Sequence, residues 1–337
     1  MKKQNRRVLL QTVLEHESLS RIEIANLTEL SPSTVSGLVN ELLEEGLLVE
    51  SGVRVATGGR SRTALTINKD RGVVAVAEIG RKSSRMILFD LALQVKHSVV
   101  LSEQYLSGNE LLVEMTQTLF QLLGHEEIRQ GMLMGIGLLF QKDMQPSDFN
   151  VVYSTGFSSA NISLVEALTT QFRVTVIEEY SQRYTVAQAM RSLKDEKVNS
   201  AHIAIGAAVV ASVNIDGHSI PLKNGIMADM TLLMTSETQC LLEADQAEEE
   251  LEPKKRGLLV RQIGMLTAIL CTLFNLDVVF LSGTAAHTQG FLNGVETYIR
   301  TAMKAQSSPR LELLHKSNGD TIKLFADTVR RKALCAQ

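Results

Sequence analysis

The sequence predicts an α/β protein in which a small, mainly helical N-terminal unit precedes a larger part built from alternating strands and helices. Two observations support this prediction. Residues 1–71 contain two helix start signals, an amphipathic helical pattern and two short strand patterns. From residue 72 onward, apolar strand-like runs alternate with helical patterns, as in α/β folds. We therefore expect two domains, residues 1–71 and residues 72–337.

The composition permits a large buried core and gives no general indication of a nucleic-acid partner. The chain has 337 residues, 45% of them hydrophobic, and a formal net charge of −3. Its cysteines, Cys240, Cys271 and Cys335, lie too far apart for a disulfide framework or a zinc-ligand motif. We expect a protein of the reducing cytoplasm.

We expect no segment to cross a membrane. The basic N-terminus runs into Glu15 without the long apolar stretch of a secretory signal. The longest uncharged run, residues 264–276, is shorter than the ~20 residues that span a bilayer. It predicts a buried helix that begins near Leu258, after a charged turn.

Helix signals are clear within residues 1–46. Ser20 and Glu23 form a capping box, which predicts a short helix ending near Thr28. Ser31 and Pro32 predict a second helix start, and Gly46 is typical of the residue that ends such a helix. Apolar residues spaced three and four apart predict one buried face on the first and on the last of three helices: Leu9, Leu10, Val13, Leu14, Val35, Leu38, Val39, Leu42 and Leu43.

Two strand-like segments follow, residues 47–52 and 63–68, with Gly58 and Gly59 in the loop between them. Three helices followed by a two-stranded wing form a winged helix-turn-helix, which is a DNA-binding architecture. A phosphate-binding enzyme loop would instead lead into a helix N-terminus. The other interpretation of three amphipathic helices is an accessory or dimerisation domain.

The outward face of the third helix is the predicted DNA-binding surface. Small or neutral residues in its N-terminal half would let the helix approach base edges: Ser33, Thr34, Ser36, Gly37 and Asn40. Three arginines of the wing are expected to contact phosphates or a minor groove: Arg54, Arg60 and Arg62. Glu41, Glu44 and Glu45 follow at the far end of the helix, where phosphates would repel them, so we expect only the N-terminal half to dock.

The order of these segments resembles the repressor form of the ROK family (repressors, open reading frames and kinases) over nearly the whole chain. In the N-terminal part the resemblance rests on NRRVLLQTVLEHESLSRIEIANLTELSPSTVSGLVNELLEEGLLVESG and GGRSRTALTIN. In the remainder it rests on AEIGRKSSRMILFDL, GIGLLF, SANISLVEALTTQFRVTVIEEYSQRYTVAQAM, IAIGAAVVASVNIDGHSIP and LTAILCTLFNLDVVFLSG. The resemblance implies two actin-like sugar-kinase lobes with a cleft between them.

The chain departs from the family where the kinases carry their chemistry. Residues 78–82, EIGRK, replace the first phosphate loop and lack its paired glycine and threonine. Residues 206–210, GAAVV, replace the glycine-rich second loop with side chains that would crowd a phosphate. The catalytic aspartate aligns with Glu179-Tyr180, and a tyrosine with a pKa of about 10 is a poor general base at neutral pH. We expect no catalytic residue and no enzyme activity.

The zinc-binding segments of the family are also incomplete. Residues 225–229, GIMAD, replace the segment that supplies a histidine to zinc and a glutamate to the sugar, and the cysteine knuckle retains only Cys240. One thiolate cannot hold a four-coordinate structural zinc. We predict no metal site and no cofactor.

Asn161 and Glu179 are the possible ligand contacts that the resemblance leaves. Asn161 matches a position that borders the sugar, although an asparagine before a helix can equally be an N-cap. Glu178 and Glu179 are neighbours on a strand, so at most one can face the cleft, and a solvated strand end is the alternative. The effector is therefore a sugar or sugar phosphate, a different molecule, or absent.

Together these features predict a DNA-binding transcriptional regulator, most simply a repressor of carbohydrate-related genes. A homodimer would place two winged domains on an inverted-repeat operator in double-stranded DNA. Two alternatives stay open. One is a regulator controlled by a protein partner without a small effector, and the other is an active sugar kinase with a DNA-binding appendage.

Overall fold

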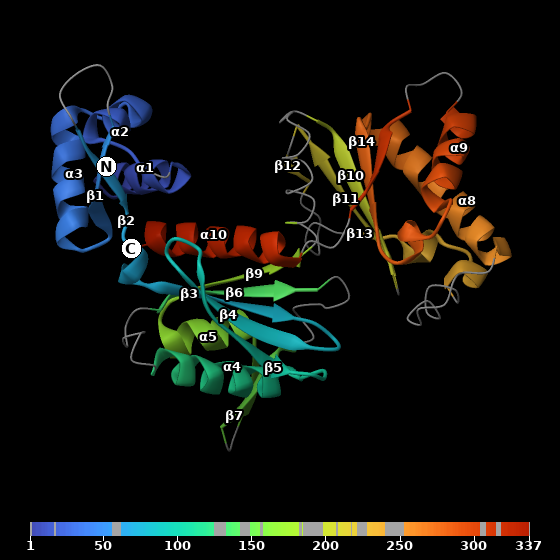
Figure 1. The fold of residues 1–337 in the computed structure, drawn as a ribbon. Helices are drawn as coiled ribbons and strands as arrows, with labels where there is room; N and C mark the ends of the chain where they lie inside the picture. The colour runs from blue at the N-terminus through green and yellow to red at the C-terminus, as the bar shows by residue number, and fades with distance from the viewer. Residues whose placement is uncertain are drawn as a thin grey trace. The chain divides into compact units, whose positions relative to one another are not determined.

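The chain folds into two compact units (Figure 1), Met1–Ser181 with Ile322–Gln337 and Gln182–Thr321. The computed structural model describes residues 2–16, 18–55, 62–124, 133–141, 149–155, 158–181, 184, 198–206, 208–216, 218–220, 228–239, 253–303, 308–314 and 318–336. The first unit contains the N-terminal helices, one mixed sheet and the C-terminal helix, and the second contains the other large sheet.

The N-terminal segment forms the predicted winged helix-turn-helix. Its elements are α1 (Lys2–Glu15), α2 (Arg21–Thr28), α3 (Pro32–Glu44), β1 (Leu48–Val55) and β2 (Arg62–Ile67). The capping box is present: the Ser20 hydroxyl accepts the Glu23 amide at 3.4 Å, and the Glu23 carboxylate accepts the Ser20 amide at 2.7 Å. Ser31 caps α3, and Gly46 follows the helix with a φ of 71°, in the left-handed region that glycine favours.

The two predicted helical faces form the core of this segment. Of the nine apolar side chains predicted to form these faces, eight are buried and Leu43 is half-buried. β1 and β2 pair antiparallel, and Leu19 adds one bridge to Leu65. Since this bridge joins the segment between α1 and α2 to the wing, the helices and the strands form one small domain.

The rest of the first unit is a five-stranded sheet with helices on both faces. Its strands are β3 (Val73–Ile79), β4 (Ser84–Asp90), β5 (Val95–Ser102), β6 (Leu133–Phe140) and β9 (Thr175–Tyr180), in the order β5-β4-β3-β6-β9. β3, β4 and β5 are antiparallel, while β3, β6 and β9 are parallel. The helices α4 (Gly108–Leu123) and α5 (Leu164–Phe172) cover one face (Figure 1). A short ribbon of β7 (Val151–Thr155) and β8 (Ser158–Ile162), which the sequence did not predict, lies between β6 and α5 in the chain.

The other face of this sheet holds the C-terminal helix α10 (Asn318–Ala336), which the sequence analysis missed. Two glycines of β6 allow its close approach. A Cβ atom at Gly137 would lie 2.6 Å from the Phe325 ring and from Val329, and one at Gly135 would lie 3.1 Å from the Ala333 Cβ atom. The two glycines therefore leave the space on β6 against which α10 packs.

α10 also contacts the winged domain. Arg331 donates to the Leu14 carbonyl at 3.2 Å and lies 3.4 Å from the Glu15 carboxylate. Arg330 donates to the Leu91 carbonyl at 2.6 Å, and both arginines pair with Asp327. One helix thus joins the end of α1 to the sheet of the first unit.

The second unit has a sheet with the order β12-β11-β10-β14-β15, and β13 pairs with β11. Its elements are β10 (Ser200–Ile205), β11 (Val209–Ile215), β12 (His218–Ser219), β13 (Ala228–Asp229), η3 (Thr231–Leu233), α8 (Pro253–Phe274), β14 (Val278–Ser282), η4 (Ala285–His287), α9 (Phe291–Met303) and β15 (Arg310–Leu313). β10 and β11 form an antiparallel hairpin, and β14 is parallel to β10.

α8 is the one helix of the described residues long and apolar enough to cross a membrane by length and composition. It begins at Pro253, not near Leu258, so the charged residues before Leu258 belong to its first turns. Leu259, Ile263 and Leu266 are buried in a core that α8 shares with α9 and the sheet. This packing is typical of a core helix in a globular protein.

Candidate nucleic-acid interface

The N-terminal half of α3 presents a neutral surface. Ser33, Gly37 and Asn40 are exposed, and Thr34 and Ser36 are half-buried. The Ser31 hydroxyl lies 2.9 Å from that of Ser33 and 2.8 Å from that of Thr34, and it caps the Thr34 amide at 3.2 Å. The predicted contacts at this end are therefore a hydroxyl cluster at a helix N-terminus, where backbone amides favour an anion.

Gly37 lies on the same exposed surface, and the fold gives no packing reason for a glycine there. A Cβ atom at this position would meet no atom within 4 Å, and its φ is not in the left-handed region. A glycine inside a helix costs roughly 1 kcal/mol relative to alanine. The missing side chain leaves a flat surface that a groove of DNA can approach closely.

The Asn40 side chain is hydrogen-bonded to a residue of α2. Arg21, the first residue of α2, donates from Nη2 to the Asn40 Oδ1 atom at 3.0 Å. This contact joins the two helices of the helix-turn-helix. The sequence pattern predicts Asn40 as a contact but gives no sign of Arg21, because the two residues are 19 positions apart.

The acidic end of α3 is largely neutralised by α1. Lys2 lies 2.7 Å from the Glu41 carboxylate, and Arg6 makes a two-pronged contact with Glu45 at 2.8 and 2.6 Å. The hydrogen bonds from Arg6 lower the pKa of the Glu45 carboxyl. Two basic residues of the N-terminus are thus occupied within the domain, and the repulsion expected from Glu41 and Glu45 is reduced.

The wing is only partly covered by the described residues. β1 ends at Val55 and β2 begins at Arg62, and Val55 pairs with Arg62 while Arg54 pairs with Thr63. Arg60 and the side chains of Arg54 and Arg62 lie outside the described residues. Their contact with DNA stays a prediction.

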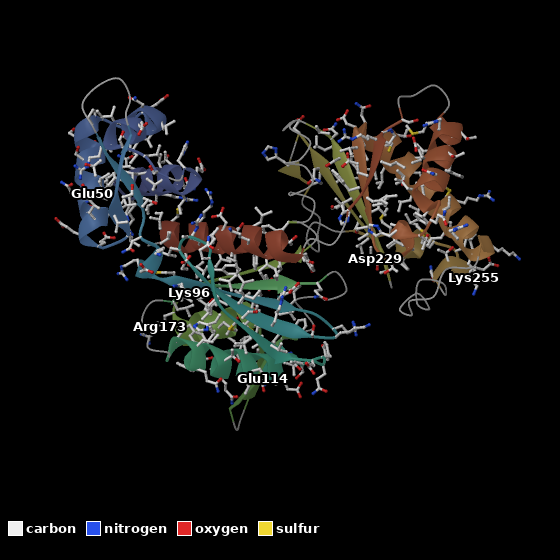
Figure 2. All side chains as sticks on the ribbon, viewed as in Figure 1. Glu50, Lys96, Glu114, Arg173, Asp229 and Lys255 are labelled. Carbon is white, nitrogen blue, oxygen red and sulfur yellow. The ribbon has the colours of Figure 1, made fainter. Side chains whose placement is uncertain are left out.

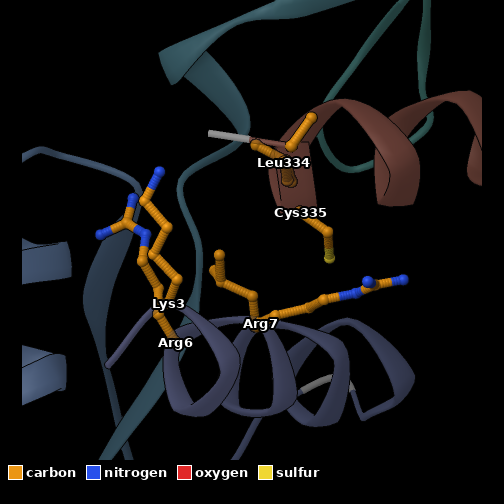
Figure 3. Close-up of a pocket in the computed structure, with 7 residues that line it drawn as sticks. Lys3, Arg6, Arg7, Leu334 and Cys335 are labelled. Atoms are coloured by element: carbon orange, nitrogen blue, oxygen red, sulfur yellow. The ribbon is translucent and has the colours of Figure 1, made fainter. Parts of the chain in front are cut away.

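Glu50, Lys96 and Lys255 are examples of charged side chains that are exposed at the surface (Figure 2). A shallow hollow lies between α1 and the end of α10, with Lys3 and Arg7 on one side and Leu334 and Cys335 on the other (Figure 3). Burial raises the pKa of the Cys335 thiol, and the nearby arginines oppose this effect. The thiol is therefore mainly protonated at neutral pH and part of the packing between the two helices.

The positions of the two family phosphate loops use their backbone amides internally. The Gly80 amide donates to the Ser84 hydroxyl at 3.4 Å, and Glu78 pairs with Arg85 at 2.7 Å. In the second loop the Gly206 amide donates to the Ala208 carbonyl, and the Val209 amide donates to the Thr231 hydroxyl, both at 3.0 Å. These three amides are therefore engaged within the chain and are not free to bind phosphate oxygens.

The neighbouring carboxylates of β9 lie on opposite faces of the sheet. Glu179 shares a row with Glu78 and Leu139, on the face that α10 covers, and is half-buried. Glu178 shares a row with Leu138 on the other face. Its side chain is largely exposed, and partial desolvation, reinforced by Glu179, raises its pKa. Tyr180, at the position of the catalytic aspartate, packs against the core.

Asn161 is not an N-cap. It is an exposed residue of β8 and pairs with Val152, whereas α5 is capped by Ser163, whose hydroxyl accepts the Glu166 amide at 3.1 Å. The N-cap interpretation was therefore wrong, because the strand continues to Ile162. The two predicted ligand residues, Asn161 and Glu179, lie in different sheets of the first unit.

The described residues contain no group of three histidine, cysteine or acidic side chains that could hold a metal ion. Cys240 and residues 225–227, on which part of the zinc prediction rests, lie outside the described residues.

Comparisons with known proteins agree with this architecture. A sequence model for winged helix-turn-helix DNA-binding domains matches residues 2–49. A solved structure of a ROK family transcriptional regulator, a homolog of the E. coli MLC protein, has a TM-score of 0.71 and 16% identity, with coverage of 99% of this chain and 98% of that one. The chain therefore shares its fold with this regulator. The predicted winged domain followed by an actin-like ROK fold is thus confirmed.

Other ROK proteins match parts of the chain. The ROK hexokinase from Thermus thermophilus has a TM-score of 0.53 and 14% identity over 76% of this chain and 97% of its own. At such identities the likeness shows the fold alone. About three quarters of this chain is enough to match nearly the whole hexokinase.

Two curated relatives are regulators. The xylose repressor of Bacillus subtilis (strain 168) is 25% identical over 240 residues, which are 68% of this chain and 60% of the repressor. The DNA-binding transcriptional dual regulator NagC of Escherichia coli (strain K12) is 25% identical over 226 residues, 64% of this chain and 54% of its own. The matched region thus spans less than two thirds of either relative.

Proposed function

We propose that this chain is a sequence-specific DNA-binding transcriptional regulator, a repressor of carbohydrate-related genes. The observation that carries the proposal is the winged helix-turn-helix match over residues 2–49, together with an α3 surface that is neutral and open at Gly37. The named relatives include a xylose repressor and the regulator NagC. Residues 1–71 would bind DNA, and residues 72–337 would sense an effector and support dimerisation.

The proposed DNA contacts are the N-terminal half of α3 and the wing. Ser33, Ser36 and Asn40 would approach base edges, with Thr34 supporting the helix N-terminus. Arg54, Arg60 and Arg62 would contact phosphates or a minor groove. The pairing of Glu41 and Glu45 with α1 supports this orientation, because it lowers the repulsion between the far end of α3 and the DNA backbone.

We propose no catalytic role for the ROK fold in this chain. Two observations support this proposal. Hydrogen bonds within the chain occupy the amides of Gly80, Gly206 and Val209, which would otherwise bind nucleotide phosphates. Tyr180, which aligns with the catalytic aspartate of the kinases, packs against the core. A sugar or sugar phosphate near Asn161 or Glu179 is the proposed effector class, and a protein partner is the alternative. A cytoplasmic homodimer is the proposed working form.

The test is binding of the purified protein to DNA from upstream of its own coding region and to random duplex, at several salt concentrations. Sequence-preferring binding that weakens with salt supports the proposal. Arg60→Ala should weaken binding to all sequences and flatten the salt dependence, whereas Ser36→Ala should change the preference among sequences. Equal binding of both duplexes by a folded protein contradicts it.

The kinase alternative has its own test, a coupled assay of ATP consumption over a panel of sugars. Sugar-dependent turnover would contradict the proposed loss of catalysis. The partner-protein alternative would be favoured if no sugar or sugar phosphate changed the melting temperature of the dialysed protein.

A further inference from the structure

Arg21 constrains the chemistry that Asn40 can offer to DNA. A guanidinium group has only hydrogen-bond donors, so the side-chain atom of Asn40 that faces Arg21 must be the amide oxygen. The distance from Arg21 Nη2 to Asn40 Oδ1 is 3.0 Å. Because Arg21 holds this oxygen against α2 and occupies one of its two lone pairs, the NH₂ group, which only donates, is the part of the exposed Asn40 turned toward outside partners.

The placement of Arg21 supports a role in orienting this amide. Arg21 is half-buried, and its Nε atom is buried without a hydrogen-bond partner among the described residues. A buried, unpaired donor destabilises a protein. Among the described residues, the hydrogen bond that positions this guanidinium is the one from Nη2 to Asn40, a residue of the proposed DNA-binding surface.

Asn40 also lies where a base edge can come close. It is one helical turn beyond Gly37, at which a Cβ atom would meet nothing within 4 Å. A freely rotating asparagine binds adenine through both its oxygen and its NH₂ group, because adenine offers a donor and an acceptor in the major groove. Guanine offers two acceptors there, N7 and O6, which match a donor-only group.

We propose that Arg21 is a positioning residue that fixes Asn40 as a donor, so that Asn40 selects guanine at one position of each half-site. The inference rests on the proposed DNA-binding function and deepens it. Arg21 itself contacts no base in this arrangement.

The experiment is selection of binding sites from a duplex library with 30 randomised base pairs, about three helical turns. It is carried out with the full chain and with the variants Arg21→Met, Arg21→Lys and Asn40→Ala. The full chain should enrich a motif with guanine at one position per half-site, by about fivefold or more over adenine, the lower end of the range for a specific base contact. Arg21→Lys keeps a donor beside Asn40 and should keep guanine.

Arg21→Met keeps an apolar stem but frees the amide, so adenine should rise at that single position while the remaining motif is unchanged. Asn40→Ala should lose the preference at the same position. The inference is overturned if Arg21→Met retains guanine, if it weakens all sequences equally as a phosphate contact would, or if Asn40→Ala leaves the motif intact.

A folded protein that enriches no motif at all would overturn the proposed function, and this inference with it. The two failures are therefore distinguishable. If only the inference fails, the full chain still enriches a motif, and the base chosen at the Asn40 position can be compared between variants. Circular dichroism of each variant identifies any loss of helix.

Discussion

Gly37 has no role in the packing of α3, yet it lies in the middle of the helix that would enter the groove. Gly37→Ala should raise the free energy of unfolding by about 0.5–1 kcal/mol, because glycine loses more backbone entropy on folding. The same change should weaken DNA binding, because the added methyl group would hold the helix away from base edges. Urea unfolding and fluorescence anisotropy with labelled DNA measure the two effects.

Gly257→Ala is the matched control. Gly257 is an exposed helical residue of α8, and a Cβ atom there also meets nothing within 4 Å. This variant should gain similar stability and bind DNA as the unmodified protein does. If Gly37→Ala also binds DNA normally, close approach at Gly37 is not needed.

The Arg6–Glu45 pair gives the winged domain a pH dependence with a defined sign. Because Arg6 lowers the pKa of Glu45 in the folded state, the pair stabilises the fold above the unfolded pKa of glutamate, about 4.3, and this stabilisation is lost as the pH falls through the lower folded pKa. Arg6→Ala should reduce the free energy of unfolding at pH 7 by about 0.2–1 kcal/mol, the range for exposed pairs. In urea unfolding, the difference from the unmodified protein should shrink as the pH falls below about 4.3 and the Glu45 carboxylate becomes protonated.

Glu45→Gln provides the second arm of this test. If the two side chains act as a pair, the double variant should be no less stable than either single one. Additive effects at pH 7 would show that Arg6 and Glu45 act independently.

Among the elements, α10 connects parts of the first unit that are far apart in the sequence. It lies on Gly135 and Gly137 of β6, donates from Arg330 to the Leu91 carbonyl, and donates from Arg331 to the end of α1. A shift of this helix would therefore disturb its contacts with both the sheet and the winged domain.

Gly137→Ala tests this connection. The new methyl carbon would lie 2.6 Å from Phe325 and Val329, so the variant should lose about 1–3 kcal/mol of stability, as overpacked cores do. Hydrogen exchange in α1 should also rise, because α10 would be displaced from its contact with Leu14. A second change that makes room, Phe325→Leu, should restore part of both properties. Unchanged exchange in α1 would show that the winged domain is held independently of α10.

For the whole molecule, the proposed homodimer makes a geometric prediction about its operator. Two winged domains related by a two-fold axis require half-sites about one helical turn, or a multiple of it, apart. Inserting about 5 base pairs between the half-sites should reduce affinity strongly, and inserting about 10 should restore part of it, because only the second keeps both sites on one side of the duplex. Anisotropy titrations of the three duplexes test this. Equal affinities would indicate independent monomers.

The sequence by itself determined the elements whose signals are local. The capping box at Ser20, the Ser31-Pro32 start and the Gly46 stop are interactions within one helical turn, and each appears at its predicted place. The strands β3, β4, β6 and β9 were likewise predictable from short apolar runs. The loss of the kinase motifs was visible at the level of individual residues, since it needed no knowledge of packing.

Other features were decided only by tertiary structure. Arg6 meets Glu45 across 39 positions, Arg21 meets Asn40 across 19, and Arg331 meets Leu14 across 317. No spacing rule links such residues, because their contact depends on how helices pack and not on the turn of one helix. The same holds for the face that each of Glu178 and Glu179 occupies, which the register of β9 against β6 fixes.

α10 illustrates the boundary between the two. Its apolar positions, Ile322, Phe325, Ala326, Val329 and Ala333, have a helical spacing that could have predicted the helix from the sequence. The sequence could not tell which surface would cover that face, because a glycine pair on a strand is compatible with many neighbours. Packing against Gly135 and Gly137 decided it, since the absence of side chains at these two positions lets the helix approach the sheet closely.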